Sequence, residues 1–157
     1  MKVLSNPWTS IPGYNCFGCS PENPTGLKMK FLEEDQFLVC EWEPELKFQG
    51  YHNILHGGIQ ATLMDEIASW TVFVKADKGG VTSRVEIKYR KPVFINKGKI
   101  LLKSQLLDIN KRIARVHVEL FNNEQLLCSE AWFEYFIVAT GKSDDGLVFP
   151  GKEAFYR

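Results

Sequence analysis

Bulky apolar residues in the middle of the chain recur at steps of three and four positions, from about Gly57 to Lys75. This spacing places them on one face of a helix and predicts a single long helix there. Gly79-Gly80 follows this segment and is expected to stop the helix. The residues that form the predicted apolar face are Ile59, Leu63, Ile67, Trp70 and Val74.

After residue 80, apolar and polar residues alternate, which is typical of strands with one buried and one polar face. Turn-forming residues divide this region into separate strands. Four strands are predicted, over 81–90, 100–107, 114–121 and 125–138. Before the helix, two β-prone runs at 28–31 and 36–42 are joined by a charged turn and predict a hairpin.

The predicted order is therefore two strands, one helix and four strands, which is an α+β arrangement with a predominantly antiparallel sheet. A single helix covers only one face of such a sheet. The other face, or an edge, must meet something else, and a second copy of the chain is the simplest partner. Residues 1–27 are rich in turn formers and predict an irregular leader, 28–139 are expected to form the folded domain, and 140–157 form a tail.

Composition narrows the class of protein. The length of 157 residues suits one compact domain, and its 45% hydrophobic and 24% charged residues are ordinary for a soluble globular protein. Lys and Arg number 19, as do Asp and Glu, which argues against a protein built to coat nucleic acid. The chain has no apolar run of transmembrane length and no apolar core of a signal peptide near its start. A cytoplasmic protein without a membrane or nucleic-acid partner is expected.

The start of the predicted helix is one candidate for chemistry. Gly57 and Gly58 follow His56 and open the helix, where the first backbone N–H groups lack intrahelical partners. Because glycine has no side chain, a ligand oxygen can approach these N–H groups closely, and this is how a backbone oxyanion hole is made. The alternative is that the two glycines only permit a tight turn.

Asp65 is the second candidate. Its neighbours at three and four positions along the helix are all small, whereas the bulky residues lie on another face. A stripe of small side chains leaves space for a ligand or for another backbone, and a buried carboxylate there needs a partner or a purpose. The alternative is a solvated Asp beside Glu66, which points about 100° further around the helix.

Taken together, these features resemble the hotdog-fold thioesterase superfamily, in particular the PaaI-like acyl-CoA thioesterases. The relatives carry His-Gly-Gly at a helix start and a carboxylate nine residues after the histidine, here Asp65. The segments 16–27, 48–51 and 81–92 are similar to the same relatives, so the resemblance covers roughly residues 14–138. It implies a hotdog fold, with one long central helix wrapped by a predominantly antiparallel sheet of about five to six strands. It also implies homodimers with active sites between subunits, with a dimer of dimers (a homotetramer) left open.

The resemblance further implies the hydrolysis of an acyl-CoA to a free acid and coenzyme A. Asp65 would act as general base or as nucleophile, and the N–H of Gly58, with Gly57 nearby, would polarise the thioester carbonyl. His56 would position that loop. No metal and no cofactor beyond the substrate's own coenzyme A is expected, because a thioester is already activated.

Two other functions remain open. One is a hotdog dehydratase or hydratase of acyl thioesters, although those relatives carry a Phe-Pro-Gly-type loop where this chain has Gly50-Tyr51-His52-Asn53. The other is a non-catalytic acyl-CoA-binding protein. Release of free coenzyme A thiol distinguishes hydrolysis from both.

The substrate-binding candidates depart in part from the family pattern. Some relatives place an Asn six residues before the histidine, where this chain has Gly50, so Gln49 and Asn53 are the candidates for that role. Thr82 matches a hydroxyl that some relatives use to hold the attacking water. Strict alternation nevertheless assigns Thr82 to the face opposite Val81 and Val85.

The neutral total charge conceals a segregated distribution, because residues 84–115 contain ten basic and only two acidic residues. A small anion such as the phosphates of coenzyme A can meet a local basic patch of this kind. The alternative is a solvated sheet face. The candidates for the phosphates are Arg84, Lys88, Arg90 and Lys91.

The four cysteines give a weaker signal. Cys16-x-x-Cys19 offers half of a zinc site or a redox pair, but no second CxxC follows, and a structural zinc site usually takes four protein ligands. Cys40 and Cys128 are isolated on predicted strands, where a free thiol behaves as a small hydrophobic side chain.

Overall fold

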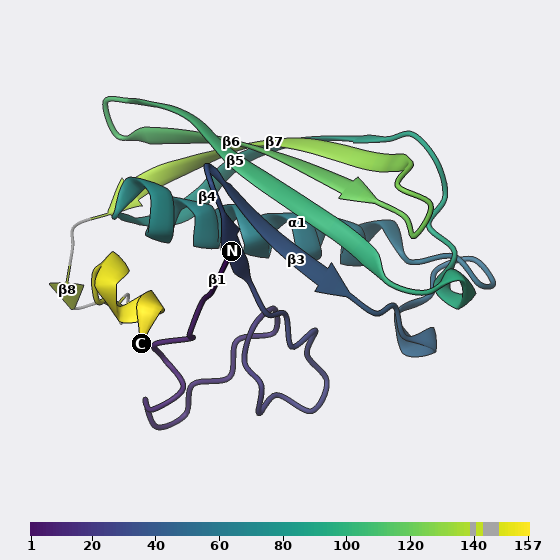
Figure 1. The fold of residues 1–157 in the computed structure, drawn as a ribbon, viewed down its shortest axis with the longest axis horizontal. Helices are drawn as coiled ribbons and strands as arrows, with labels where there is room; N and C mark the ends of the chain where they lie inside the picture. Colours follow the sequence, from purple (N-terminus) through teal and green to yellow (C-terminus); the bar gives the residue numbers. More distant parts are fainter. Residues whose placement is uncertain (139–140, 143–147) are drawn as a thin grey trace.

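The computed structural model describes residues 1–138, 141–142 and 148–157. They form a seven-stranded sheet with the order β1-β2-β3-β5-β6-β7-β4, in which every neighbouring pair is antiparallel. The helix α1 (Gly57–Thr71) runs along one face of this sheet (Figure 1). The strands are β1 (Lys2–Val3), β2 (Leu32–Glu34), β3 (Phe37–Trp42), β4 (Gly79–Tyr89), β5 (Ile100–Asn110), β6 (Ile113–Phe121) and β7 (Leu127–Val138).

The remaining elements are short. Outside the main sheet, β8 (Gly141–Lys142) and β9 (Val148–Phe149) pair with each other. The short helical turns are η1 (Leu46–Phe48), η2 (Val72–Ala76), η3 (Ile95–Lys97) and η4 (Lys152–Tyr156). None of the helices in the described ranges has the length and apolar character needed to span a bilayer.

This architecture confirms the α+β class and the hotdog arrangement. The predicted order of two strands, one helix and four strands holds from β2 to β7, and β1 precedes it. The sheet has seven strands rather than five to six because β1 adds a seventh at its edge. Two residues are too few for a period to be recognised, so β1 could not be predicted from alternation. The hairpin is present, but its first strand is Leu32–Glu34, and none of the predicted residues 28–31 is in a strand.

The predicted apolar face of the helix is buried from Leu63 onward, and Leu63 and Ile67 are fully inaccessible. It continues through the π-helical turn η2 and ends at Asp77, whose left-handed backbone (φ 52°) breaks the helical repeat. The expectation that Gly79-Gly80 stops the helix is therefore wrong. Both glycines belong to β4, and a Cβ at Gly79 would lie 3.0 Å from a Val138 methyl carbon, so a side chain there would require its neighbours to shift.

The alternation along β4 is interrupted once. The pairing of β4 with β7 matches Thr82 with Tyr135 but Arg84 with Glu134, so the register shifts between them and Ser83 is the extra residue of a β-bulge. Because a bulge inserts one extra residue, the alternation of side chains between the two faces of the sheet is shifted by one on one side of it. Thr82 consequently lies on the same face of the strand as Val85, which corrects the assignment from strict alternation.

Both ends of the chain pack on the same core as the central region. Leu4, Cys19 and Leu27 of the leader are buried, and so is Phe155 near the C-terminus. The Phe155 ring lies 5.1 Å from the Trp70 ring of α1, in edge-to-face contact. The leader runs along the side of α1 that faces away from the sheet (Figure 1). The predicted boundary between residues 139 and 140 lies outside the described residues.

Candidate functional site

The carboxylate of Asp65 lies under the β4 and β7 end of the sheet, in the middle of α1. The Thr82 hydroxyl donates to Asp65 Oδ1 over 2.8 Å, and the Tyr135 hydroxyl donates to the same oxygen over 2.6 Å. Asp65 Oδ2 makes no hydrogen bond within the described part of the chain. The side chain is half-buried. Two donors therefore fix one carboxylate oxygen and leave the other available to a ligand.

Tyr135 was not among the residues predicted for the site. Burial raises the pKa of its phenol well above the ordinary range, and the charge of Asp65 raises it further. The phenol therefore stays protonated and serves as a donor. The sequence carried one signal for this role, because a tyrosine within an apolar strand usually needs a hydrogen-bond partner for its hydroxyl.

The start of α1 has a different arrangement. His56 caps the helix, and its Nδ1 accepts the N–H of Gly58 over 2.9 Å. The Gly58 N–H, which was expected to be available, is therefore taken up by a side chain of the same chain. The Gly57 N–H makes no hydrogen bond with any described residue, while the Gly57 carbonyl accepts the Tyr89 hydroxyl over 2.7 Å. The unused donor at this end of the helix is Gly57.

The loop before the helix brings Gln49 and Asn53 together. The Gln49 Oε1 accepts the Asn53 backbone N–H over 3.2 Å, and the Asn53 amide donates to Asn96 over 2.9 Å. A Cβ at Gly50 would lie 3.3 Å from the His56 Cα, so a side chain at this position is disfavoured. A hollow of about 350 Å³ lies beside this loop, lined by Gly50, Tyr51, Ile54, Leu55, His56 and Gly57.

Asp65 and Gly57 do not meet within one chain. They are eight residues apart on one helix, which corresponds to about 12 Å along the axis at 1.5 Å per residue. Both are nevertheless tied to β4, Asp65 through Thr82 near the start of the strand and Gly57 through Tyr89 at its end.

Glu66, the residue after Asp65, faces the leader. Its carboxylate Oε1 lies 3.5 Å from the Cys16 Sγ, and Cys19 is close to both. Burial raises the pKa of Glu66 to about 7. The pKa of the Cys16 thiol is lowered to about 5, chiefly by its hydrogen bond with Cys19. Beside this group lies a groove of about 470 Å³. Its lining comes mainly from the leader, from Glu66 and Ser69 of α1, from Phe73 of η2 and from the two glycines of β4.

None of the four basic candidates makes a hydrogen bond or ion pair with Asp65 in the described part of the chain. Arg84 and Lys88 pair in register with Glu134 and Glu130 of β7, on the face of the sheet opposite α1. The Lys88 ammonium lies 5.3 Å from the centre of the Trp132 ring. Arg90, just after β4, is also on this outer side, as its ion pair shows.

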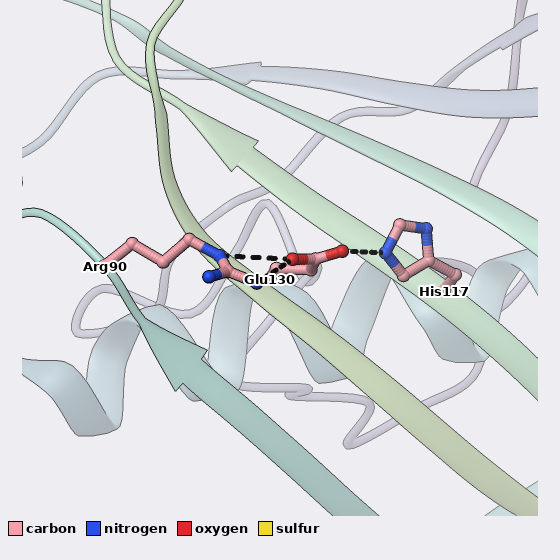
Figure 2. A network of polar contacts seen from close by, with 3 residues as sticks. All are labelled: Arg90, His117 and Glu130. Atoms are coloured by element: carbon pink, nitrogen blue, oxygen red, sulfur yellow. Dashed lines mark hydrogen bonds and ion pairs between the residues drawn. The ribbon is translucent and has the colours of Figure 1, made fainter.

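The Arg90 guanidinium binds one oxygen of Glu130 over 2.7 Å, and His117 Nε2 lies 2.8 Å from the other oxygen. Figure 2 shows the Glu130 carboxylate between these two side chains. Arg90 therefore has an internal partner. Lys91 instead lines a separate hollow of about 430 Å³ together with Lys97.

Comparison with known proteins relates this arrangement to a family. Residues 52–129, which include His56, both glycines and Asp65, match the family model described as the thioesterase superfamily. A search of curated proteins by sequence gave no significant match.

Many solved structures share the fold. A thioesterase superfamily protein, RHA08564, superposes with a TM-score of 0.69 at 18% identity, covering 74% of this chain and 57% of that one. A hypothetical thioesterase from Streptococcus pneumoniae TIGR4, in a structure with coenzyme A, gives 0.65 at 21% identity, covering 71% and 89%. Zebrafish thioesterase superfamily member 2 gives 0.64 at 25% identity, covering 71% and 82%. By its family match and its fold, the chain belongs to the thioesterase superfamily.

Proposed function

We propose that this protein hydrolyses acyl-CoA thioesters to a free acid and coenzyme A, with Asp65 as the catalytic carboxylate. The observation that carries the proposal is the Asp65 side chain, whose Oδ1 is held by Thr82 and Tyr135 while Oδ2 has no partner among the described residues. A carboxylate fixed in this way is suited to accept a proton from water. The water oxygen then bonds to the acyl carbon, the carbon–sulfur bond breaks, and the thiolate leaves with a proton.

The same geometry also suits direct attack by Asp65 Oδ2 on the acyl carbon. That route forms an anhydride between the enzyme and the acyl group and releases coenzyme A, and water then hydrolyses the anhydride. In both routes negative charge develops on the thioester oxygen. The Gly57 N–H, at the positive end of the helix dipole and without an acceptor in its own chain, is suited to stabilise that charge.

The reacting groups come from two copies of the chain in this proposal. The carbonyl held by Gly57 and the oxygen that attacks it must be about 3 Å apart, whereas Gly57 and Asp65 of one chain are separated by about 12 Å of helix. A second copy therefore has to supply one of the two groups, and a homodimer is the simplest assembly that does so.

The edge strand β4 is suited to be the dimer contact. It is eleven residues long, it ends the order of the sheet, and its Val85 and Tyr89 are 46% and 52% exposed. A long edge strand with exposed apolar residues usually pairs with another chain. Antiparallel pairing of two β4 strands about their midpoint sets the Thr82 end of each against the Tyr89 end of the other. Each Asp65 would then face the Gly57 of the second copy.

The coenzyme A part of the substrate is proposed from charge and from a relative. The Streptococcus pneumoniae thioesterase was crystallised with coenzyme A. In this chain Lys91 makes no ion pair with a described residue, and it lies two positions after Tyr89, which holds the Gly57 carbonyl. We place the phosphates of coenzyme A at Lys91, and a rise in KM on charge reversal there is the measurement that tests this.

Replacement of Asp65 by Asn tests the catalytic assignment. The variant keeps the size of the side chain but loses the negative charge, so kcat for acyl-CoA hydrolysis should fall by about 10² to 10⁴. Release of free coenzyme A thiol from a panel of acyl-CoAs is the readout, with circular dichroism to check folding. The matched control is Asp108→Asn, which removes an exposed carboxylate paired with Arg115 and should leave kcat unchanged. A folded Asp65→Asn protein as fast as the wild type would overturn the proposal.

A further inference from the structure

Two cysteines of the leader and one carboxylate of α1 come together at the floor of the groove beside Glu66. The Sγ atoms of Cys16 and Cys19 and a carboxylate oxygen of Glu66 all lie within 4.8 Å of one another. Cys19 is buried, and the other two side chains are half-buried. The three residues are brought together by the fold, since Glu66 is fifty positions from Cys16 in the sequence. The hydrolytic mechanism proposed above does not use any of them.

The loop that carries the two cysteines is shaped for this contact. Gly18 lies between them and rests directly on Glu66, because a Cβ there would be only 2.5 Å from the Glu66 carboxyl carbon. A side chain at this position would require the Glu66 carboxylate or the loop to shift. Two backbone bonds hold the loop in place, from Ser20 N–H to the Cys16 carbonyl and from Met29 N–H to the Gly18 carbonyl.

The surroundings of these two sulfur atoms differ from those of the other cysteines. The Cys16 thiol donates to the Glu66 Oε1 over 3.5 Å. The Cys19 Sγ lies 3.0 Å from the Tyr14 hydroxyl and 3.6 Å from the Asn6 amide nitrogen. Groups that donate to a sulfur atom are the usual outer shell of a metal thiolate, where they orient the ligand and stabilise its charge.

Cys40 and Cys128 provide the comparison within the same chain. Each is buried on a strand, and each thiol acts as a donor, to the carbonyls of Glu41 and of Leu126. This is the arrangement of a neutral thiol that fills space in a core. Among the four cysteines, all of them in the described part of the chain, only the pair beside Glu66 has hydrogen bonds with polar side chains.

We propose that Cys16, Cys19 and Glu66 bind a divalent transition-metal ion, of which Zn²⁺ suits two thiolates and a carboxylate best. In a tetrahedral zinc site with Zn–S near 2.3 Å and Zn–O near 2.0 Å, sulfur and oxygen ligands are about 3.5 Å apart. The Cys16 Sγ and Glu66 Oε1 already have a separation of 3.5 Å. Three protein ligands leave a fourth position for water on the side of the groove.

Such an ion would fasten the leader to α1. It would bridge residues that are distant in sequence. The folded chain would therefore bind the ion more tightly than the unfolded chain does. Binding of this kind stabilises the folded state by mass action, so saturating Zn²⁺ should raise the Tm by roughly 5–10 °C. Removal of the ion by a chelator should reverse the rise.

The experiment measures zinc content and thermal stability of the full chain, without any substrate. The protein is kept reduced, stripped with a chelator, dialysed against a small excess of Zn²⁺ and then against buffer. We expect one zinc per chain by elemental analysis, and Co²⁺ in its place should give the intense absorption of a thiolate-to-cobalt charge transfer. Cys16→Ser, Cys19→Ser and Glu66→Gln should each lower the retained zinc and abolish the rise in Tm.

Cys128→Ser is the matched control, because it removes a buried thiol far from the cluster and should keep both the zinc and the rise in Tm. Three results would overturn the proposal. The first is no retained zinc in the reduced wild type, and the second is equal zinc retention in the three cluster variants and the control. The third is a Cys16–Cys19 disulfide in the purified protein that still gives no zinc binding after it is reduced. If a cysteine variant does not fold, Glu66→Gln decides the test, because it leaves both thiols in place. Because no readout depends on turnover, the result is independent of the test on Asp65.

Discussion

The surroundings of Asp65, in the middle of α1, and those of Gly57, at its start, are built in different ways. At Asp65, side chains from β4 and β7 hold a single carboxylate oxygen, and the leader covers the next position along the helix. At Gly57, the groups that shape the site are the helix cap of His56 and one bond from Tyr89 to the backbone. The Asp65 end depends on side chains from two distant strands, whereas the Gly57 end combines a local helix cap with one bond from β4.

This difference suits the two groups to different roles in the proposed reaction. A carboxylate that accepts a proton has to be oriented, and orientation requires partners from several elements. A backbone N–H that stabilises charge only has to be left unpaired at a helix start. Because β4 touches both ends, one strand can carry the two halves of a site to a second copy of the chain. Variants that remove one half at a time test this view.

After Asp65→Asn, the largest effect is expected from removal of the Gly57 donor. Proline is well tolerated at the first position of a helix, where its missing N–H costs no intrahelical bond. Gly57→Pro should therefore fold, and its kcat should fall by about 10² to 10³. Gly57→Ala is the control, since a Cβ there lies 3.6 Å from the Tyr89 ring and the N–H is kept. Equal kcat values for the two variants would show that the Gly57 N–H has no part in the reaction.

A smaller effect is expected from loss of one donor to Asp65. Tyr135→Phe keeps the ring in the core but removes the hydroxyl that binds Oδ1. A hydrogen bond to a charged group contributes about 1.5–3 kcal/mol, so kcat should fall roughly tenfold or more, with KM little changed. Tyr156→Phe, which loses a hydroxyl bonded to Glu33, is the control. If steady-state kinetics give the same kcat for Tyr135→Phe as for the wild type, the carboxylate does not need this support.

The smallest effect is expected from the charge near the Gly57 end. Lys91→Glu should raise KM for acyl-CoA several-fold and weaken the dependence of KM on salt, because the lost attraction acts on binding and not on the chemical step. Lys111→Glu, in the turn after β5, reverses an equally exposed charge and should change neither quantity. An unchanged KM for Lys91→Glu would show that the phosphates of coenzyme A do not bind in the hollow beside Lys91.

The sequence alone predicted the parts of the site that depend on local pattern. The spacing along one element indicated the helix start with its two glycines and the stripe of small residues around Asp65, and the family resemblance implied their roles. What could not be predicted depends on pairing between distant segments. The bulge at Ser83 turns Thr82 toward Asp65 and is set by the register against β7, which alternation does not encode.

The same limit applies to the other missed features. Tyr135 lies in a run of apolar and aromatic residues that predicts a strand but does not indicate which hydroxyl meets a carboxylate. The contact of Cys16 and Cys19 with Glu66 joins the leader to the helix, and neither segment has a local signal for the other. The leader was expected to be irregular, and apart from β1 it has little regular structure, yet it packs on the core.

The most direct test of a site shared between two chains is complementation of two inactive variants. Asp65→Asn and Gly57→Pro are each purified, unfolded and refolded together in equal amounts, and acyl-CoA hydrolysis is compared with that of each variant refolded alone. If each site takes Asp65 from one chain and Gly57 from the other, half of the dimers are mixed and hold one intact site, so activity should return to about one quarter of the wild-type value. If mixed dimers form, as shown by mass spectrometry, and activity stays at the level of the separate variants, both groups act within one chain and the account is contradicted.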